Sequence, residues 1–175
     1  MSTRKSVLLA AALALATGTA LAQQGPNLGQ PITEKEVGAW DMNAMPDGTG
    51  LPPGSGTPAQ GAPIYVQKCA ACHGEGGKGG VNAALVGNPP ITGIDSPKTI
   101  ANFWGYSTTV FDFIRRAMPW TTPRTLTNDE VYAITAYILA ENKLIGPNDV
   151  MSAQTLPKVK MPNADNFIIR FPDKI

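Results

Sequence analysis

The clearest helical pattern in the chain follows Thr127. Apolar or small side chains recur every three or four residues in two adjacent stripes, Val131, Ile134, Thr135 and Ile138 in one and Tyr132, Ala136 and Leu139 in the other. Thr127 and Glu130 have the spacing of a capping box, with Thr127 as the N-cap. Gly146 and Pro147 mark the end of the pattern. We therefore predict a helix from Thr127 towards Gly146 that buries one face.

Two shorter segments also have helical patterns. Residues 58–71 begin with a proline, which is favoured at the first helical position, and Pro63 marks either the true start or a kink. Residues 107–117 begin with hydroxyl side chains that can cap a helix, and Pro119 follows the segment and ends it. Its apolar face consists of Val110, Phe111 and Ile114. The sequence thus predicts three helices.

The segments around these helices are rich in glycine and proline. The chain has 18 glycines and 16 prolines, and many of them lie in residues 23–57, 74–97 and 147–175. We expect no helix or strand in residues 23–57, and no strand pattern in the chain is strong enough to build a sheet. Disordered segments seldom carry tryptophan, so Trp40 predicts that part of residues 37–45 lies against an apolar surface of this domain or of a partner.

The first 22 residues resemble a secretory signal peptide. Basic side chains at positions 4 and 5 precede an apolar stretch at residues 7–16, and residues 20–22 form an A-x-A cleavage site. This stretch is too short for a comfortable membrane span, which needs about 20 apolar residues. We therefore expect a periplasmic protein with no membrane span in the mature chain, with an uncleaved N-terminal anchor as the alternative.

Charge and length limit the remaining possibilities. Removing two of the 14 basic residues with the signal peptide leaves 12 basic against 13 acidic residues, a balance that argues against a nucleic-acid partner. We predict an all-α fold in four parts: signal peptide 1–22, N-terminal arm 23–57, helical domain 58–146 and C-terminal extension 147–175. Three short helices bury little apolar area, so the domain needs an added stabiliser.

The only two cysteines, Cys69 and Cys72, precede the only histidine, His73, in the motif CAACH. A zinc site needs three or four protein ligands and would have to recruit carboxylates. A thioredoxin-like dithiol belongs beside a βαβ pattern that this sequence lacks, and a disulfide across two residues would restrain the chain little. C-x-x-C-H is the direct signature of c-type haem attachment, in which His73 becomes the proximal iron ligand. A covalently held haem would also supply the missing core.

A second iron ligand must come from outside the motif. With no other histidine, the candidates in the mature chain are the methionines at positions 42, 45, 118, 151 and 161. Met118 is favoured because it follows the predicted helix 107–117 and directly precedes Pro119, with Met45 as the second choice. Ligation by His73 and Met118 would fill both axial positions and favour electron transfer over catalysis on the iron.

Several segments together resemble a family. The helix leading into CAACH, the glycine-rich loop, the Met-Pro dipeptide at 118–119 and the last helix resemble class I cytochromes c. Residues 40–57, 98–120, 126–142 and 156–163 are similar to the cytochrome subunits of molybdenum-containing sulfite dehydrogenases and of the Sox sulfur dehydrogenase. The resemblance implies a class I cytochrome c fold of three to four short helices wrapped around one covalently bound haem, with irregular N- and C-terminal extensions.

The resemblance also suggests roles for particular side chains. Trp104 and Tyr106 lie where a haem propionate is often hydrogen-bonded, and Arg115 or its neighbour could neutralise a propionate. A further set, Gly61 and Tyr65, occupies the place where the first helix crosses the last. The second ring N–H of the proximal histidine should donate to a backbone carbonyl, and we expect this carbonyl near Val81 or Asn82.

Three functions remain open for such a chain. The first is the electron-accepting subunit of a molybdopterin-containing sulfite or sulfur dehydrogenase, which would pass electrons on to a downstream cytochrome or oxidase. The second is a freely diffusing periplasmic carrier between a respiratory complex and a terminal oxidase. The third is a haem enzyme or gas sensor with a displaceable sixth ligand. The single C-x-x-C-H departs from the Sox subunit, which commonly has two haem domains, and leaves the partner's substrate undecided.

Overall fold

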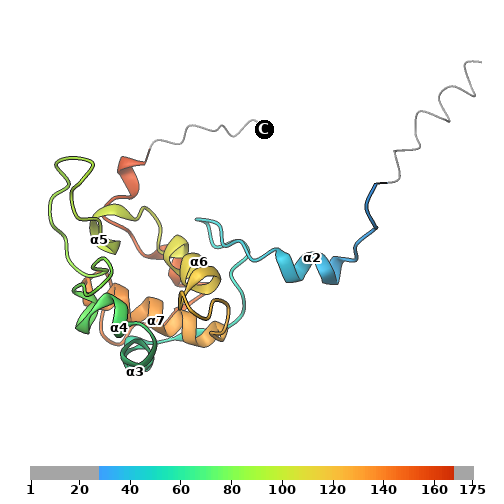
Figure 1. Ribbon diagram of the computed structural model, residues 1–175, viewed down its shortest axis with the longest axis horizontal. Helices are drawn as coiled ribbons and strands as arrows, with labels where there is room; N and C mark the ends of the chain where they lie inside the picture. The colour runs from blue at the N-terminus through green and yellow to red at the C-terminus, as the bar shows by residue number, and fades with distance from the viewer. Residues whose placement is uncertain (1–27, 168–175) are drawn as a thin grey trace, which may run out of the picture. The chain divides into compact units, whose positions relative to one another are not determined.

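A computed structural model describes residues 28–167 in two units, which divide between Trp40 and Asp41 (Figure 1). The predicted signal peptide, residues 1–22, lies outside the described residues. The second unit contains every helix and strand described below except α2. No helix within residues 28–167 is both long and apolar enough to cross a membrane.

The first unit contains the helix α2 (Glu34–Trp40), so the prediction that residues 23–57 hold no helix is wrong. The Thr33 backbone N–H and hydroxyl donate to the Glu36 carboxylate (2.7 and 2.8 Å), and the Glu36 N–H donates to the Thr33 hydroxyl (3.3 Å). This reciprocal capping offsets the poor propensity of the flanking sequence. The Trp40 side chain is 78% exposed.

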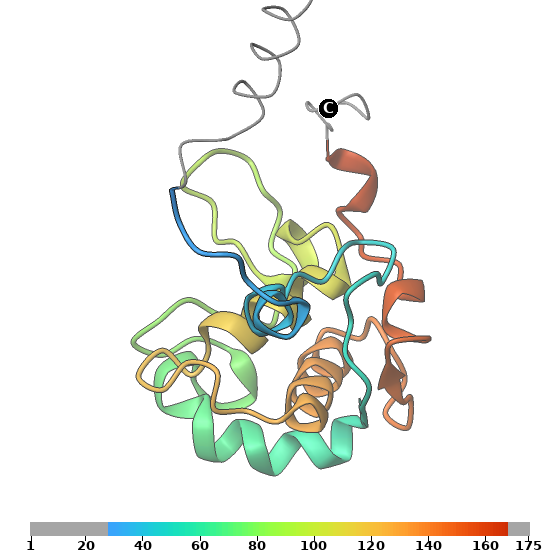
Figure 2. The ribbon, with the colours of Figure 1, turned by 90° about the vertical axis from the view of Figure 1, so that its right-hand side faces the viewer.

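The second unit is mostly helical, which confirms the all-α prediction. Its helices are α3 (Pro58–Lys68), α4 (Ala70–His73), α5 (Ile100–Phe103), α6 (Ser107–Ala117) and α7 (Asn128–Glu141), with 3-10 turns at Glu75–Gly77, Leu156–Lys158 and Ala164–Asn166. The long helices α3, α6 and α7 match the three predicted ones, and the predicted capping box of Thr127 and Glu130 is present on α7. The predicted hydroxyl cap of α6 is wrong, because Tyr106 is its N-cap and makes no side-chain capping hydrogen bond. Figure 2 shows α3 lying across α7.

A small strand pair joins the arm to the C-terminal extension. Strand β1 (Ser55–Gly56) pairs antiparallel with β2 (Met151–Ser152), although no strand was predicted. Two residues per strand are too few for an alternating pattern, so the pairing depends on tertiary packing. A Cβ atom at Gly56 would lie 2.3 Å from the Ala133 backbone nitrogen of α7, so only glycine permits this close approach.

Helices α3 and α7 cross at Gly61, as the family resemblance implied. A Cβ atom at Gly61 would lie 1.9 Å from the Ala133 carbonyl oxygen and 2.8 Å from the Cβ of Tyr137. One turn later the fully buried Tyr65 packs on Tyr137, with ring centroids 5.0 Å apart. The two helix backbones therefore approach closely at Gly61.

A Gly61→Ala variant should be destabilised by about 3 kcal/mol, because the methyl group meets backbone that cannot rotate away. Urea unfolding of the haem-loaded protein measures the change. Gly93→Ala is the matched control, since a Cβ atom there would meet nothing within 4 Å. Equal unfolding free energies for the two variants would contradict this description of the crossing.

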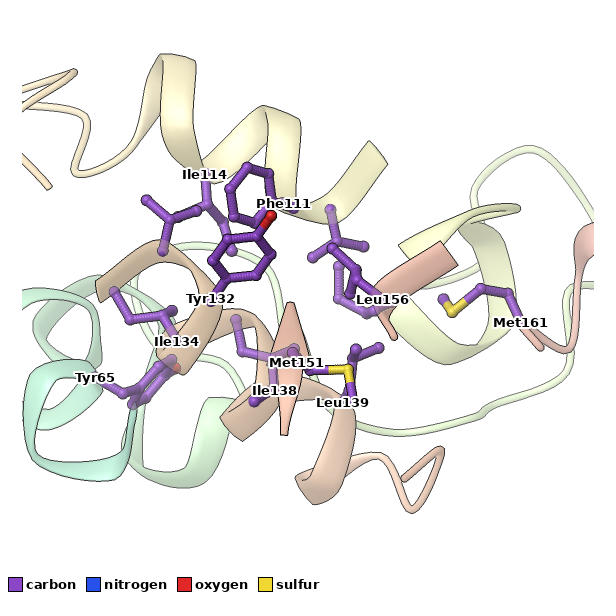
Figure 3. Close-up of a cluster of buried hydrophobic side chains, with 14 residues drawn as sticks. Tyr65, Phe111, Ile114, Tyr132, Ile134, Ile138, Leu139, Met151, Leu156 and Met161 are labelled. Carbon is purple, nitrogen blue, oxygen red and sulfur yellow. The ribbon is translucent and has the colours of Figure 1, made fainter. Parts of the chain in front are cut away.

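Helices α6 and α7 pack through aromatic and branched side chains (Figure 3). Phe111 of α6 faces Tyr132 of α7, with ring centroids 4.4 Å apart, and both rings are fully buried. The C-terminal extension closes this core through Leu156, whose carbonyl accepts a hydrogen bond from the buried Ser107 hydroxyl (2.6 Å). The extension is therefore packed onto the helices as far as this point.

Tyr132 should make the stability of the fold sensitive to alkaline pH. Burial raises the pKa of the Tyr132 hydroxyl to about 12, and the hydroxyl donates to the Pro52 carbonyl (2.9 Å). The neutral phenol is favoured in the folded state, so its contribution is complete below about pH 10 and is lost as the pH rises towards 12. Between pH 9 and 12, denaturant unfolding should show that Tyr132 makes the free energy of unfolding fall by about 2 kcal/mol. The Tyr132→Phe variant should lack this contribution. If the free energy of unfolding changed equally with pH in the wild type and in Tyr132→Phe, this assignment would be refuted.

Candidate functional site

The second unit contains a cavity of about 600 Å³ that is lined mainly by apolar side chains. Its walls come from α4, from the loop that precedes α5, from α5 and α6, from the residues after α6, and from the inner face of α7. The apolar lining includes Leu85, Ile100, Val110, Ile114, Ile134 and Ile138. This volume is within the range of sites that hold a small molecule or cofactor.

Cys69, Cys72 and His73 all line this cavity. Cys69 ends α3, where its N–H donates to the Tyr65 carbonyl (2.8 Å), and its own carbonyl accepts the N–H groups of Cys72 and His73 (3.1 and 3.0 Å). One helical turn thus brings the three side chains to the same cavity. Both thiols are free, and burial raises the pKa of the Cys69 thiol to about 11.

The His73 ring is oriented by a hydrogen bond to the backbone. Its Nδ1 lies 2.9 Å from the Ala83 carbonyl oxygen. Because a carbonyl only accepts, Nδ1 carries a proton, and in the neutral ring Nε2 is then the nitrogen with the free lone pair. The acceptor was expected near Val81 or Asn82, and the structure places it at the next residue, Ala83. The Asn82 carbonyl accepts the Gly80 N–H (3.1 Å), and the Asn82 N–H donates to the Cys72 carbonyl (2.9 Å).

Glycines let the loop after His73 return to the motif. Gly74 has φ of 77°, and a Cβ atom there would lie 2.1 Å from the Gly79 carbonyl oxygen. The Gly79 N–H donates to the His73 carbonyl (2.8 Å). Farther along the loop, the Asn142 side chain at the end of α7 donates to the Leu85 carbonyl (3.1 Å) and accepts the Gly87 N–H (3.0 Å). The loop is thus attached to the motif at its start and to α7 at Leu85 and Gly87.

Met118 lines the same cavity as His73. It is the C-cap of α6, where its N–H donates to the Ile114 carbonyl (3.1 Å). Extended backbone at Met118 (φ −119°, ψ 149°) turns the chain out of the helix before Pro119. The fold therefore brings an imidazole and a thioether that are 45 positions apart in the sequence to one cavity.

The other predicted site residues divide into two groups. Trp104 lines the cavity and packs edge-on against Phe113, with centroids 5.6 Å apart. Tyr106 and Arg115 are not among the lining residues. The Tyr106 ring packs near Phe167 (6.3 Å), and the Arg115 guanidinium donates to the Met42 carbonyl (3.5 Å). Their contact with a propionate stays a prediction.

Two lysines and an exposed tryptophan at the cavity were missed from the sequence. Lys68 and Lys98 line the cavity, and Lys68 is paired with Glu130 at 3.0 Å. Trp120 also lines it while remaining 80% exposed. Its position two residues after Met118 was the sequence signal that could have placed Trp120 at the cavity. No pattern marked Lys98, because its loop has no period.

Comparisons with known proteins agree with this geometry. Residues 56–138 match the family model described as cytochrome c oxidase, cbb3-type, subunit III. A chain of the sulfane dehydrogenase SoxCD from Paracoccus pantotrophus is similar in structure with a TM-score of 0.76 and 37% sequence identity, over 86% of this chain and 73% of that one.

A more distant relative is thiosulfate dehydrogenase of Stutzerimonas stutzeri (strain A1501), 27% identical over 124 residues. The match covers 71% of this chain and 35% of the relative, so the chain spans about a third of that protein's length. The matched domain, the fold and the cavity therefore agree. The chain belongs to the haem-binding c-type cytochromes with a class I cytochrome c fold, in the family that includes the cytochrome subunit of SoxCD.

Proposed function

We propose that the chain carries one haem c, attached through Cys69 and Cys72, and transfers single electrons. The observation that carries this proposal is the cavity that holds both thiols, the His73 imidazole and the Met118 thioether. The donor set fits the group: two thiols for thioether bonds, an imidazole with Nε2 unprotonated and a thioether for the axial positions, and apolar walls for the macrocycle. When bound, the haem supplies a one-electron couple.

The remaining methionines support Met118 as the distal ligand. Met151 and Met161 are almost fully buried in the hydrophobic core, and Met45 is 52% exposed. Met42, Met45, Met151 and Met161 do not line the cavity, whereas Met118 does. Ligation by His73 and Met118 would raise the reduction potential relative to two histidines and would leave no open position for a substrate.

Lys98 is the residue that we propose as a partner of a haem propionate. The charged lining residues are Lys68 and Lys98. Lys68 is paired with Glu130, and the Lys98 ammonium donates to the Ile94 and Ser96 backbone carbonyls. Lys68 is also adjacent to Cys69, at the edge where the vinyl groups would attach. The propionates would lie at the porphyrin edge away from the vinyl groups, and Lys98, just before α5, would offset their charge there.

The partner that we propose is a molybdopterin-containing sulfite or sulfur dehydrogenase subunit, in the periplasm, with a downstream cytochrome or oxidase as acceptor. Support comes from two relatives whose names denote sulfur-compound dehydrogenases. Export is expected from residues 1–22, which lie outside the described residues. The first unit adds a surface suited to a stable partner, since Leu28, Ile32, Val37 and Trp40 are exposed there.

Co-purification from the native host tests this partnership. Full-length protein with an affinity tag should recover a molybdopterin subunit, and addition of sulfite or thiosulfate to the complex should reduce the haem. A variant lacking residues 28–40 removes the exposed apolar side chains without touching residues 41–57, which pack on the helices. We expect it to bind haem normally and to lose most of the partner.

The outcomes separate the candidate functions. Haem reduction by either compound in a recovered complex supports the dehydrogenase subunit. Normal haem content without a recovered partner, together with rapid reduction of an added terminal oxidase, identifies a diffusing carrier instead. Carbon monoxide binding to the reduced wild-type protein would favour a haem enzyme or sensor, because it requires a displaceable sixth ligand.

A further inference from the structure

A buried carboxylate on α6 connects the arm to the end of the helix that carries Met118. Asp112 is only 6% exposed, and its carboxylate accepts the Ala44 backbone N–H (3.2 Å) and pairs with Arg116 one turn later. A carboxylate this deeply buried needs such partners to offset the loss of hydration. Asp112 therefore links the arm and α6 in a single polar cluster.

The last turn of α6 makes further contacts with the arm. The Arg116 guanidinium donates to the Asn43 side-chain oxygen (3.1 Å), and Arg115 donates to the Met42 carbonyl. Together these contacts attach residues 42–44 to the last turn before Met118. The arginines predicted to face a propionate thus have backbone and side-chain partners in the arm.

Residues 43–52 of the arm, which belong to the second unit, are themselves held firmly enough to act as a support. Gly50 has φ of 82°, and a Cβ atom there would lie 1.9 Å from the Asn43 carbonyl oxygen, so the loop folds back closely on itself. Farther along, the Pro52 carbonyl accepts the Tyr132 hydroxyl (2.9 Å), which anchors the arm to α7. Ala44 and Leu51 pack against the hydrophobic core between these points.

From these contacts we propose that Asp112 is a positioning residue, which acts through α6 to hold Met118 at the haem. Phe113, Ile114 and Met118 line the cavity, whereas Asp112 and Arg116 contact the arm. The arm thus holds α6 relative to α7, which forms another wall of the cavity. This inference rests on the proposed ligation by Met118. Loss of the polar cluster should weaken the bond from the Met118 thioether to the iron while Met118 itself remains in the chain.

Displacement of the thioether by imidazole measures this effect. In the haem-loaded, full-length ferric protein, Asp112→Ala should bind added imidazole about tenfold more tightly than wild type, since a buried hydrogen-bonded charge is removed. Arg116→Gln keeps the Ala44 contact and should give a smaller shift, and it serves where the alanine variant does not fold. Hydrogen exchange in residues 113–118 should be faster in both variants, which provides a readout independent of the iron.

Asp149→Ala is the control, because its carboxylate also accepts a backbone N–H, that of Gly146 (2.7 Å), but the residue follows α7 and lies outside α6. Its imidazole affinity should equal that of wild type. Wild-type affinity in both α6 variants, with the far-red absorption band of a thioether bound to ferric iron intact, overturns the role of Asp112 alone. Absence of that band from the wild-type protein overturns ligation by Met118 and the role of Asp112 with it.

Discussion

Replacing both Cys69 and Cys72 with alanine is expected to abolish covalent haem attachment and to leave most of the protein unfolded. The two thiols supply both thioether bonds, and the cavity of about 600 Å³ needs an occupant, because its apolar walls would otherwise face water. After expression with cytochrome maturation machinery, haem staining of a denaturing gel and circular dichroism measure attachment and folding.

Each single cysteine variant is the control, since it keeps one possible thioether bond. We expect reduced but detectable staining and an absorption maximum shifted by the vinyl group left unsaturated. The interpretation fails if the double variant retains haem through acid and acetone extraction, or if its helix content and unfolding midpoint equal those of wild type.

Replacing Met118 with alanine is expected to change the iron site without removing the haem. The ferric protein should lose the far-red band of a thioether ligand, its reduction potential should fall, and the reduced protein should bind carbon monoxide, because one axial position becomes open. Absorption spectroscopy, redox titration and carbon monoxide difference spectra measure these three changes.

Met45→Ala is the matched control, because Met45 was the second candidate from sequence, is 52% exposed and does not line the cavity. It should keep the band, the potential and the closed iron site. A Met118→Ala protein with an unchanged far-red band would require another distal ligand.

The sequence identified the parts of the fold that carry local signals. Helices α6 and α7 were predictable because their apolar positions repeat at helical spacing, and the capping residues of α7 are close in sequence. The motif at residues 69–73 was predictable for a similar reason, since its chemistry lies within one turn. The close crossing at Gly61 came from the family resemblance rather than from any periodic pattern.

Other features depend on contacts between distant segments. The His73 ring selects the Ala83 carbonyl because the loop is folded back by glycines and because the Asn82 carbonyl has another donor. Strands β1 and β2 are 95 positions apart and exist only through tertiary pairing. Arg115 illustrates the same limit. A basic residue near a haem suggests a propionate contact, whereas its partner in the structure is the Met42 carbonyl of the arm.

Intact mass spectrometry of the mature wild-type protein, combined with its alkaline pyridine spectrum, tests the haem assignment most directly. We expect a mass equal to the chain plus one haem, with thioether bonds located at Cys69 and Cys72 by peptide mapping and the spectrum of a haem with both vinyl groups saturated. A mass without haem after expression with the maturation machinery, or a haem that dissociates from the denatured chain, would contradict it.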